Sequence, residues 1–142
     1  MQSISALEIV ITFRERFIEA IRTTGEVVPF CSVQPGYTIR SAGDAGEVVI
    51  IRETFGAIQV IVEIIKQGGD CHSVVLKTTD VQTALPKEDL RANLLQGETE
   101  LESNKTIGGR VVLEGLKPSE YSIQVLQKDQ VVGNIKMHLK RI

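Results

Sequence analysis

The sequence predicts a mainly β protein, an antiparallel β-sandwich of about seven strands that follows an N-terminal amphipathic helix. Three observations predict this fold class. Residues 108–126 contain two strand-like runs around a Gly-Leu-x-Pro corner, short apolar runs recur with turn signals after residue 56, and a helical apolar periodicity precedes them. We therefore divide the chain into a helix-and-connector segment, 1–56, and a sandwich, 57–142, and leave open whether they share one core.

The predicted helix covers residues 5–24. Residues 5–8, Ser-Ala-Leu-Glu, have the spacing of a capping box, and Gly25 is a typical helix end. The apolar residues that recur at helical intervals are Val10, Phe13, Phe17, Ala20 and Ile21. The β-branched run at 9–12 would also suit a strand, so a strand is the alternative at this position.

The connector, residues 26–56, contains short apolar runs separated by Pro and Gly. Its predicted strands lie at 27–33, 37–40 and 47–53, and the Gly-rich turn at 43–46 would join the last two as a hairpin. That turn lacks the Lys and Ser or Thr of a phosphate-binding loop, so we expect no nucleotide site there.

The sandwich segment contains seven apolar runs at the spacing of short strands. These predicted strands are 58–66, 72–78, 89–96, 99–103, 110–116, 121–127 and 131–140. Turn residues such as Gly-Gly-Asp, Leu-Pro and Gly-Glu separate them, which is the pattern of a two-layered sandwich.

Residues 89–139 resemble a known family. The matching parts are the strand at 90–95, the run Gly-Arg-Val-Val-Leu-Glu-Gly-Leu at 109–116, Pro118, and the strand Tyr-Ser-Ile-Gln-Val at 121–125. They resemble the carboxypeptidase regulatory-like, or transthyretin-like, family of immunoglobulin-type sandwiches. In that family a Gly usually follows the Pro, whereas Ser119 stands here. The resemblance implies a topology and no particular activity.

Composition excludes several function classes. The net charge is −2, and the aromatic residues are four Phe and two Tyr with no Trp, so we expect no nucleic-acid or membrane partner. No apolar run is long enough for a membrane helix or a signal peptide, which predicts a soluble, cytoplasmic protein. The layout of a helix before a sandwich is also similar to small bacterial proteins linked to signalling loci.

Two candidate sites involve cysteine and histidine. Asp70, Cys71 and His72 are the residue types of a nucleophilic site, but neighbours in a strand point to opposite faces. We therefore favour an inward Cys71 and an outward His72. Cys31, Cys71, His72 and His138 could supply four zinc ligands, yet they lack the short spacings of zinc sites, so we expect no cofactor or metal.

The function that these observations favour is a non-catalytic interaction or regulatory module that binds a protein partner or a second copy of itself. The predicted partner-binding residues are Val10, Phe13, Phe17 and Ile21 on the helix, and Lys136, His138 and Lys140 in a basic C-terminal stripe. The alternative for the stripe is a charged edge strand that discourages pairing. The alternative functions are a small enzyme around Cys71 and His72, and a carrier with a ligand pocket between helix and sheet.

Overall fold

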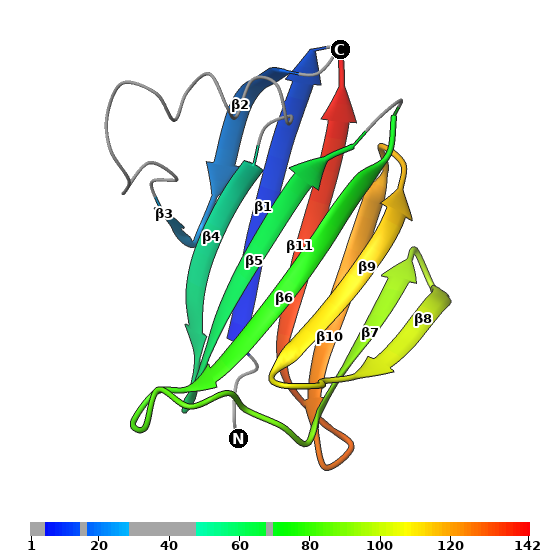
Figure 1. Ribbon diagram of the computed structural model, residues 1–142. Helices are drawn as coiled ribbons and strands as arrows, with labels where there is room; N and C mark the ends of the chain where they lie inside the picture. The colour runs from blue at the N-terminus through cyan, green and yellow to red at the C-terminus, as the bar shows by residue number, and fades with distance from the viewer. Residues whose placement is uncertain (1–4, 15–16, 29–47, 68–69) are drawn as a thin grey trace.

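The computed structural model describes residues 5–14, 17–28, 48–67 and 70–142 (Figure 1). These residues form eleven strands in two sheets. Sheet A has the order β2 (Phe17–Thr23), β1 (Ser5–Arg14), β11 (Gln130–Arg141), β10 (Glu120–Gln127), β7 (Leu90–Gln96) and β8 (Thr99–Lys105). Sheet B has the order β3 (Glu26–Val28), β4 (Val48–Phe55), β5 (Ile58–Lys66), β6 (His72–Asp80) and β9 (Arg110–Leu116). The mainly β prediction is confirmed, and the two stacked sheets fit a sandwich.

The predicted N-terminal helix is wrong, because its residues form β1 and β2 instead. Along β1 the side chains of Leu7, Ile9, Ile11 and Phe13 are buried in strict alternation with more exposed neighbours. That period of two is the period of a strand, and the β-branched run at 9–12 suits it. None of the described residues lies in a helix, so the described part contains no helix that could span a membrane.

The first and last strands lie side by side in the middle of sheet A (Figure 1). β1 pairs with β11 in parallel, in a register that runs from Ser5 opposite Gly133 to Phe13 opposite Arg141. The other strand pairs among the described residues are antiparallel. The expectation of a wholly antiparallel arrangement is therefore wrong at this one ladder, and β11 is a central strand.

Strand positions after residue 56 agree closely with the sequence pattern. β5 and β9 have the predicted bounds, and the other five strands differ by at most two residues at either end. In the connector, β4 matches the strand predicted at 47–53, and β3 overlaps the start of the one predicted at 27–33, whose other residues lie outside the described part. The strand predicted at 37–40 and its Gly-rich turn lie outside the described residues.

The core fills the space between the sheets. Inward side chains of β1 and β4 belong to the same buried apolar cluster as those of β5, β6, β7, β9, β10 and β11. The closest approach is at Gly133 on β11, where a Cβ would overlap the ring of Phe55 on β4. Glycine at this position lets the aromatic ring lie directly against the backbone of the opposite sheet.

The Gly-Leu-x-Pro corner carries the chain from β9 in sheet B to β10 in sheet A. Gly115 has φ of 72°, a left-handed conformation that glycine adopts without strain. Tyr121, at the start of β10, is buried and its hydroxyl donates a 2.7 Å hydrogen bond to the carbonyl oxygen of Lys117. This bond ties the corner to the strand that follows it.

Candidate interaction surface

The parallel pairing of β1 with β11 brings residues from both ends of the sequence onto the outward face of sheet A. Val10 lies directly opposite His138, and Glu8 lies opposite Lys136. These residues alternate with the buried ones on the same strands, so their side chains point away from the core. Val10 therefore meets Lys136 and His138, predicted partner-binding residues from the other end of the sequence, on one surface.

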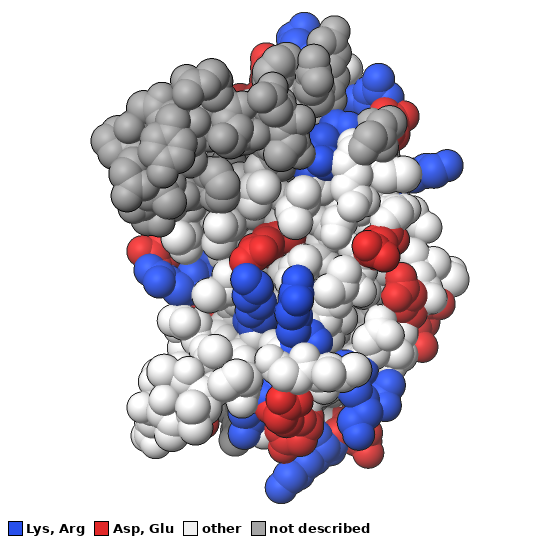
Figure 2. Space-filling view, viewed as in Figure 1, with Lys and Arg blue, Asp and Glu red and all other residues white. Residues whose placement is uncertain are grey.

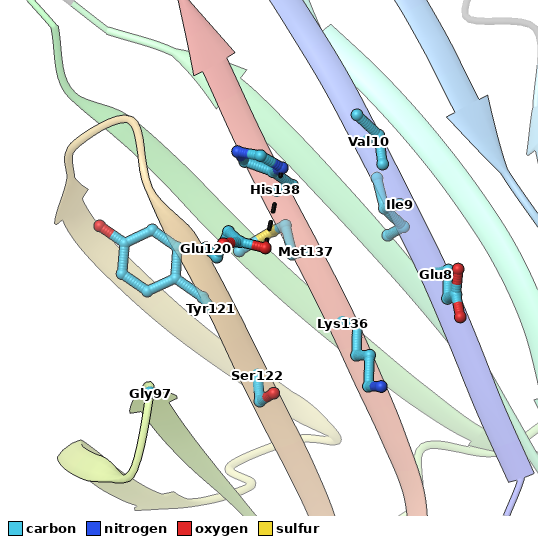
Figure 3. Close-up of a pocket in the computed structure, with 10 residues that line it drawn as sticks. All are labelled: Glu8, Ile9, Val10, Gly97, Glu120, Tyr121, Ser122, Lys136, Met137 and His138. Carbon is cyan, nitrogen blue, oxygen red and sulfur yellow. Dashed lines mark ion pairs between the residues drawn. The ribbon is translucent and has the colours of Figure 1, made fainter.

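An open groove of about 520 Å³ follows this surface over β1, β11 and β10, and we call it the A-face groove (Figure 3). The side chains of Glu8, Val10, Lys136 and His138 line it, together with Glu120 and Ser122 from β10 and Gly97 from the β7–β8 turn. The same lining includes Ile9, Tyr121 and Met137, whose side chains are buried on the inner face. The groove is thus a shallow trough along strand backbones with polar walls.

The charges of the A-face groove alternate in sign. Lys136 is exposed and has Glu8 beside it on β1 and Ser122 beside it on β10. Nδ1 of His138 lies 3.9 Å from a carboxylate oxygen of Glu120, whose side chain is 81% exposed. This contact is an ion pair only when His138 is protonated, and at this exposure it contributes little to stability. The exposure leaves Glu120 accessible to a partner.

The basic stripe is not an edge strand. Lys136, His138 and Lys140 lie on β11, which has β1 on one side and β10 on the other. A strand paired on both sides needs no charges to prevent edge-to-edge association. The edge-protection alternative for these residues is therefore wrong, and Lys140 extends the stripe opposite Thr12.

The remaining predicted partner-binding residues are not in the groove. Phe13 is only 1% exposed and lies in the core, with its ring centroid 4.3 Å from that of His72. Ile21 is 39% exposed on the edge strand β2. Phe17 belongs to the same strand, and its side chain is outside the described part of the structure.

His72 points into the core, which reverses the expected orientations of Cys71 and His72. The side chain of His72 is 1% exposed, whereas Cys71 is half-buried just before β6. Nδ1 of His72 lies 3.2 Å from the carbonyl oxygen of Leu116, and its buried Nε2 has no hydrogen-bond partner among the described residues. No hydrogen bond joins Cys71 to His72, and Asp70 pairs with Arg141 instead. The three residues do not form a nucleophilic site.

Lys66 is a further buried polar residue at this end of the core. It is 7% exposed, faces His72 across the β5–β6 ladder, and its Nζ donates a 3.3 Å hydrogen bond to the carbonyl oxygen of Gln67. Burial lowers the pKa of His72 from its ordinary value of 6.5, and the positive charge of Lys66 lowers it further. Sequence analysis missed Lys66, although its place in the alternation of β5 predicts an inward side chain.

Two of the four residues considered as zinc ligands, His72 and His138, do not lie together. His72 lies between the sheets, and His138 lies on the outward face of sheet A. Cys31 is outside the described residues, and the described residues contain no cluster of three metal-ligating side chains. The carrier hypothesis placed its pocket between helix and sheet, and the described residues supply no helix to build one.

Comparisons with protein-family models, curated proteins and solved structures find no match for this chain. The likeness of residues 89–139 to the carboxypeptidase regulatory-like family therefore stays a prediction from the residues themselves.

Proposed function

We propose that this protein is a non-catalytic interaction module that binds a protein partner on the A-face groove, as part of a bacterial-type signalling or assembly system. One observation carries the proposal. Val10, Lys136 and His138 share a single open groove in the middle of a sheet, on a strand pair with no edge to protect. Val10, Lys136 and His138 alternate with the buried residues of β1 and β11, so among the described residues they lie outside the core cluster.

The size of the face supports a protein rather than a small ligand. Sheet A has six strands of 7 to 12 residues, so the face measures roughly 24 Å across the strands and about 28 Å along them, or roughly 670 Å². This is about the area that each partner contributes to a standard protein–protein interface. The half-buried Val10 supplies apolar contact, while Lys136 and Lys140 favour acidic groups on the partner.

The proposal includes an immunoglobulin-type topology for β5 to β11. Two features support it: the adjacency of β9, β6 and β5 in one sheet and of β8, β7, β10 and β11 in the other, and the hydrogen bond from Tyr121 to Lys117. A tyrosine that closes the corner between sheets in this way is a hallmark of immunoglobulin-type sandwiches. Such sandwiches host many unrelated functions, so the function rests on the groove and not on the fold.

Affinity capture with matched charge variants tests this function. Immobilised wild-type protein is compared with Lys136→Glu and with Lys128→Glu, which makes the same charge change in the exposed β10–β11 turn. We expect Lys136→Glu to lower the affinity for the captured partner at least about tenfold, because it places a carboxylate beside Glu8 in the groove. Lys128→Glu should retain the partner.

Partner affinity is then measured by titration calorimetry, and a urea unfolding curve confirms that each variant is folded. Equal affinity for wild type and Lys136→Glu would contradict the proposed surface.

A further inference from the structure

His138 is the group of the A-face groove whose charge can change near neutral pH. The ionisable side chains among the described residues that line the groove are Glu8, Glu120, Tyr121, Lys136 and His138. Between about pH 5.5 and pH 7.5 carboxylates stay negative, lysine stays positive and tyrosine stays neutral, whereas a histidine side chain gains or loses a proton. The charge of the lining therefore depends on this one imidazole.

The fixed charges of the lining nearly cancel, so the proton on His138 decides their sum. Glu8 and Glu120 contribute two negative charges, and Lys136 contributes one positive charge. The lining therefore has a net charge of −1 with a neutral imidazole and 0 with a protonated one. Protonation removes the excess negative charge that opposes an acidic partner.

Charged groups from each neighbouring strand surround the imidazole. They are Glu120 on β10, Glu8 on β1, Arg22 on β2, and Lys136 and Lys140 on β11 itself. Glu120 lies directly opposite His138, and its carboxylate oxygen is 3.9 Å from Nδ1 (Figure 3). On the other side Val10 lies opposite His138, and Arg22 lies opposite Val10. Protonation of His138 thus compensates the charge of Glu120 beside the three cations.

Both members of this contact are open to solvent. The side chain of His138 is 37% exposed and that of Glu120 is 81% exposed. A proton reaches the imidazole without any rearrangement of the strands, and an acidic group of a partner can contact the protonated ring in the groove. An exposed contact of this kind stabilises the pair only weakly, so it does not withhold the charged imidazole from a partner.

From this arrangement we infer that the A-face groove binds its partner in a proton-dependent way, with acidic groups held more tightly once His138 is protonated. The inference rests on the proposed function and adds a regulation to the same surface. On protonation one positive charge appears beside Val10, at the place where the partner binds. Because a single exposed charge contributes modestly, the affinity for an acidic partner should rise about two- to fivefold from pH 7.5 to pH 5.5.

The outer face of sheet B provides an internal control. Its charges are fixed in this pH range: Glu63 on β5 and Lys77 on β6 form a 2.7 Å ion pair there, and Figure 2 shows basic atoms beside acidic atoms on this face. The chain has two histidines and neither lies on it, since His72 is buried between the sheets and His138 lies on sheet A. A change of pH should therefore leave this face as it is.

Nuclear magnetic resonance of the isotope-labelled whole chain tests the inference. The probe is an acetylated and amidated peptide, Asp-Val-Asp-Val-Asp, whose carboxylates stay ionised at pH 5.5, and its control is Lys-Val-Lys-Val-Lys. Affinities are measured at pH 7.5 and pH 5.5 from the shifts of the Val10 and Lys136 amides. We expect the aspartate peptide to bind about two- to fivefold more tightly at pH 5.5, and the lysine peptide to bind more weakly there. The Glu63 and Lys77 amides should not shift with either peptide.

Two substitutions of His138 make the test sharper. His138→Gln stays neutral and should keep the lower affinity for the aspartate peptide at both pH values, whereas His138→Lys stays charged and should keep the higher affinity at both. His72 is unchanged in the two variants, so a pH dependence that arises in the core would persist in them.

Two kinds of failure are distinguishable. Equal affinity of the wild type at the two pH values, a pH dependence that persists in His138→Gln, or tighter binding of both peptides at pH 5.5 would overturn the inference and leave the proposed function intact. No binding of the aspartate peptide at either pH, or equal affinity of wild type and Lys136→Glu for it, would contradict the proposed function and the inference together.

Discussion

Replacing Phe13 with alanine separates a core role for this residue from a partner-binding role. Phe13 is 1% exposed, is one of the largest fully buried side chains, and its ring lies 4.3 Å from that of His72. Truncation of a buried phenylalanine costs about 3–5 kcal/mol in lost burial and residual cavity. The free energy of unfolding of a domain is about 5–15 kcal/mol in total. Phe13→Ala should therefore remove about a fifth of it or more.

Urea unfolding, followed by circular dichroism, measures this loss. Phe13→Leu roughly conserves volume and should cost less than about 1.5 kcal/mol, while Arg14→Ala, exposed on the same strand, should stay within about 0.5 kcal/mol. A loss below about 1 kcal/mol in Phe13→Ala, with an unchanged slope against urea, would refute the placement of β1 in the core. An exposed helical residue would give that result.

Two further predictions concern the core. Gly133→Ala should lower the free energy of unfolding by about 1–3 kcal/mol, because the added methyl overlaps the ring of Phe55. The loss should be smaller in a Phe55→Leu background. If urea unfolding shows that the losses of the two substitutions simply add, the contact is contradicted. Because burial lowers the pKa of His72 in the folded state, the unfolded chain binds a proton first as pH falls. The contribution of His72 to the free energy of unfolding should be constant above about pH 6.5 and decrease below it. In unfolding curves between pH 8 and 5, His72→Phe should therefore reduce the dependence of the free energy of unfolding on pH.

Most strands were predictable because their inward and outward positions differ clearly. In β5, Ile58, Val60, Val62 and Ile64 alternate with half-buried residues, and turn residues bound the run on both sides. Local pattern and tertiary burial agree here, so periodicity alone identifies the element. The same agreement holds for β9 and for the corner after it.

The N-terminal hairpin was not predictable in the same way, because its apolar residues fit the period of a helix as well as the period of a strand. Phe13, Phe17 and Ile21 are four residues apart, a spacing that suits a helix and also falls on alternate strand positions. The partner that decides between them is β11, at the other end of the chain. The long-range ladder with β11, together with the antiparallel pairing to β2, fixes β1 as a strand.

The candidate surface could be predicted residue by residue but not as a unit. The sequence indicates that Lys136 and His138 share one face of a strand, yet nothing local places Val10 beside them. The groove exists because a parallel ladder joins β1 and β11, which lie near opposite ends of the sequence. The same ladder makes β11 central, which removes the edge-strand alternative that its terminal position in the sequence favours.

The pairing of β1 with β11 also constrains the order of folding. Ser5 pairs with Gly133, so the middle of sheet A requires contacts between the most distant parts of the described chain. Contacts of such long sequence separation slow folding, since the loop-closure entropy is lost before the pairing is gained. During synthesis on a ribosome the apolar β1–β2 hairpin emerges early and waits for its neighbour until the last strand appears. That waiting time exposes Leu7, Ile9 and Ile11, which makes this hairpin prone to aggregation until β11 has been made.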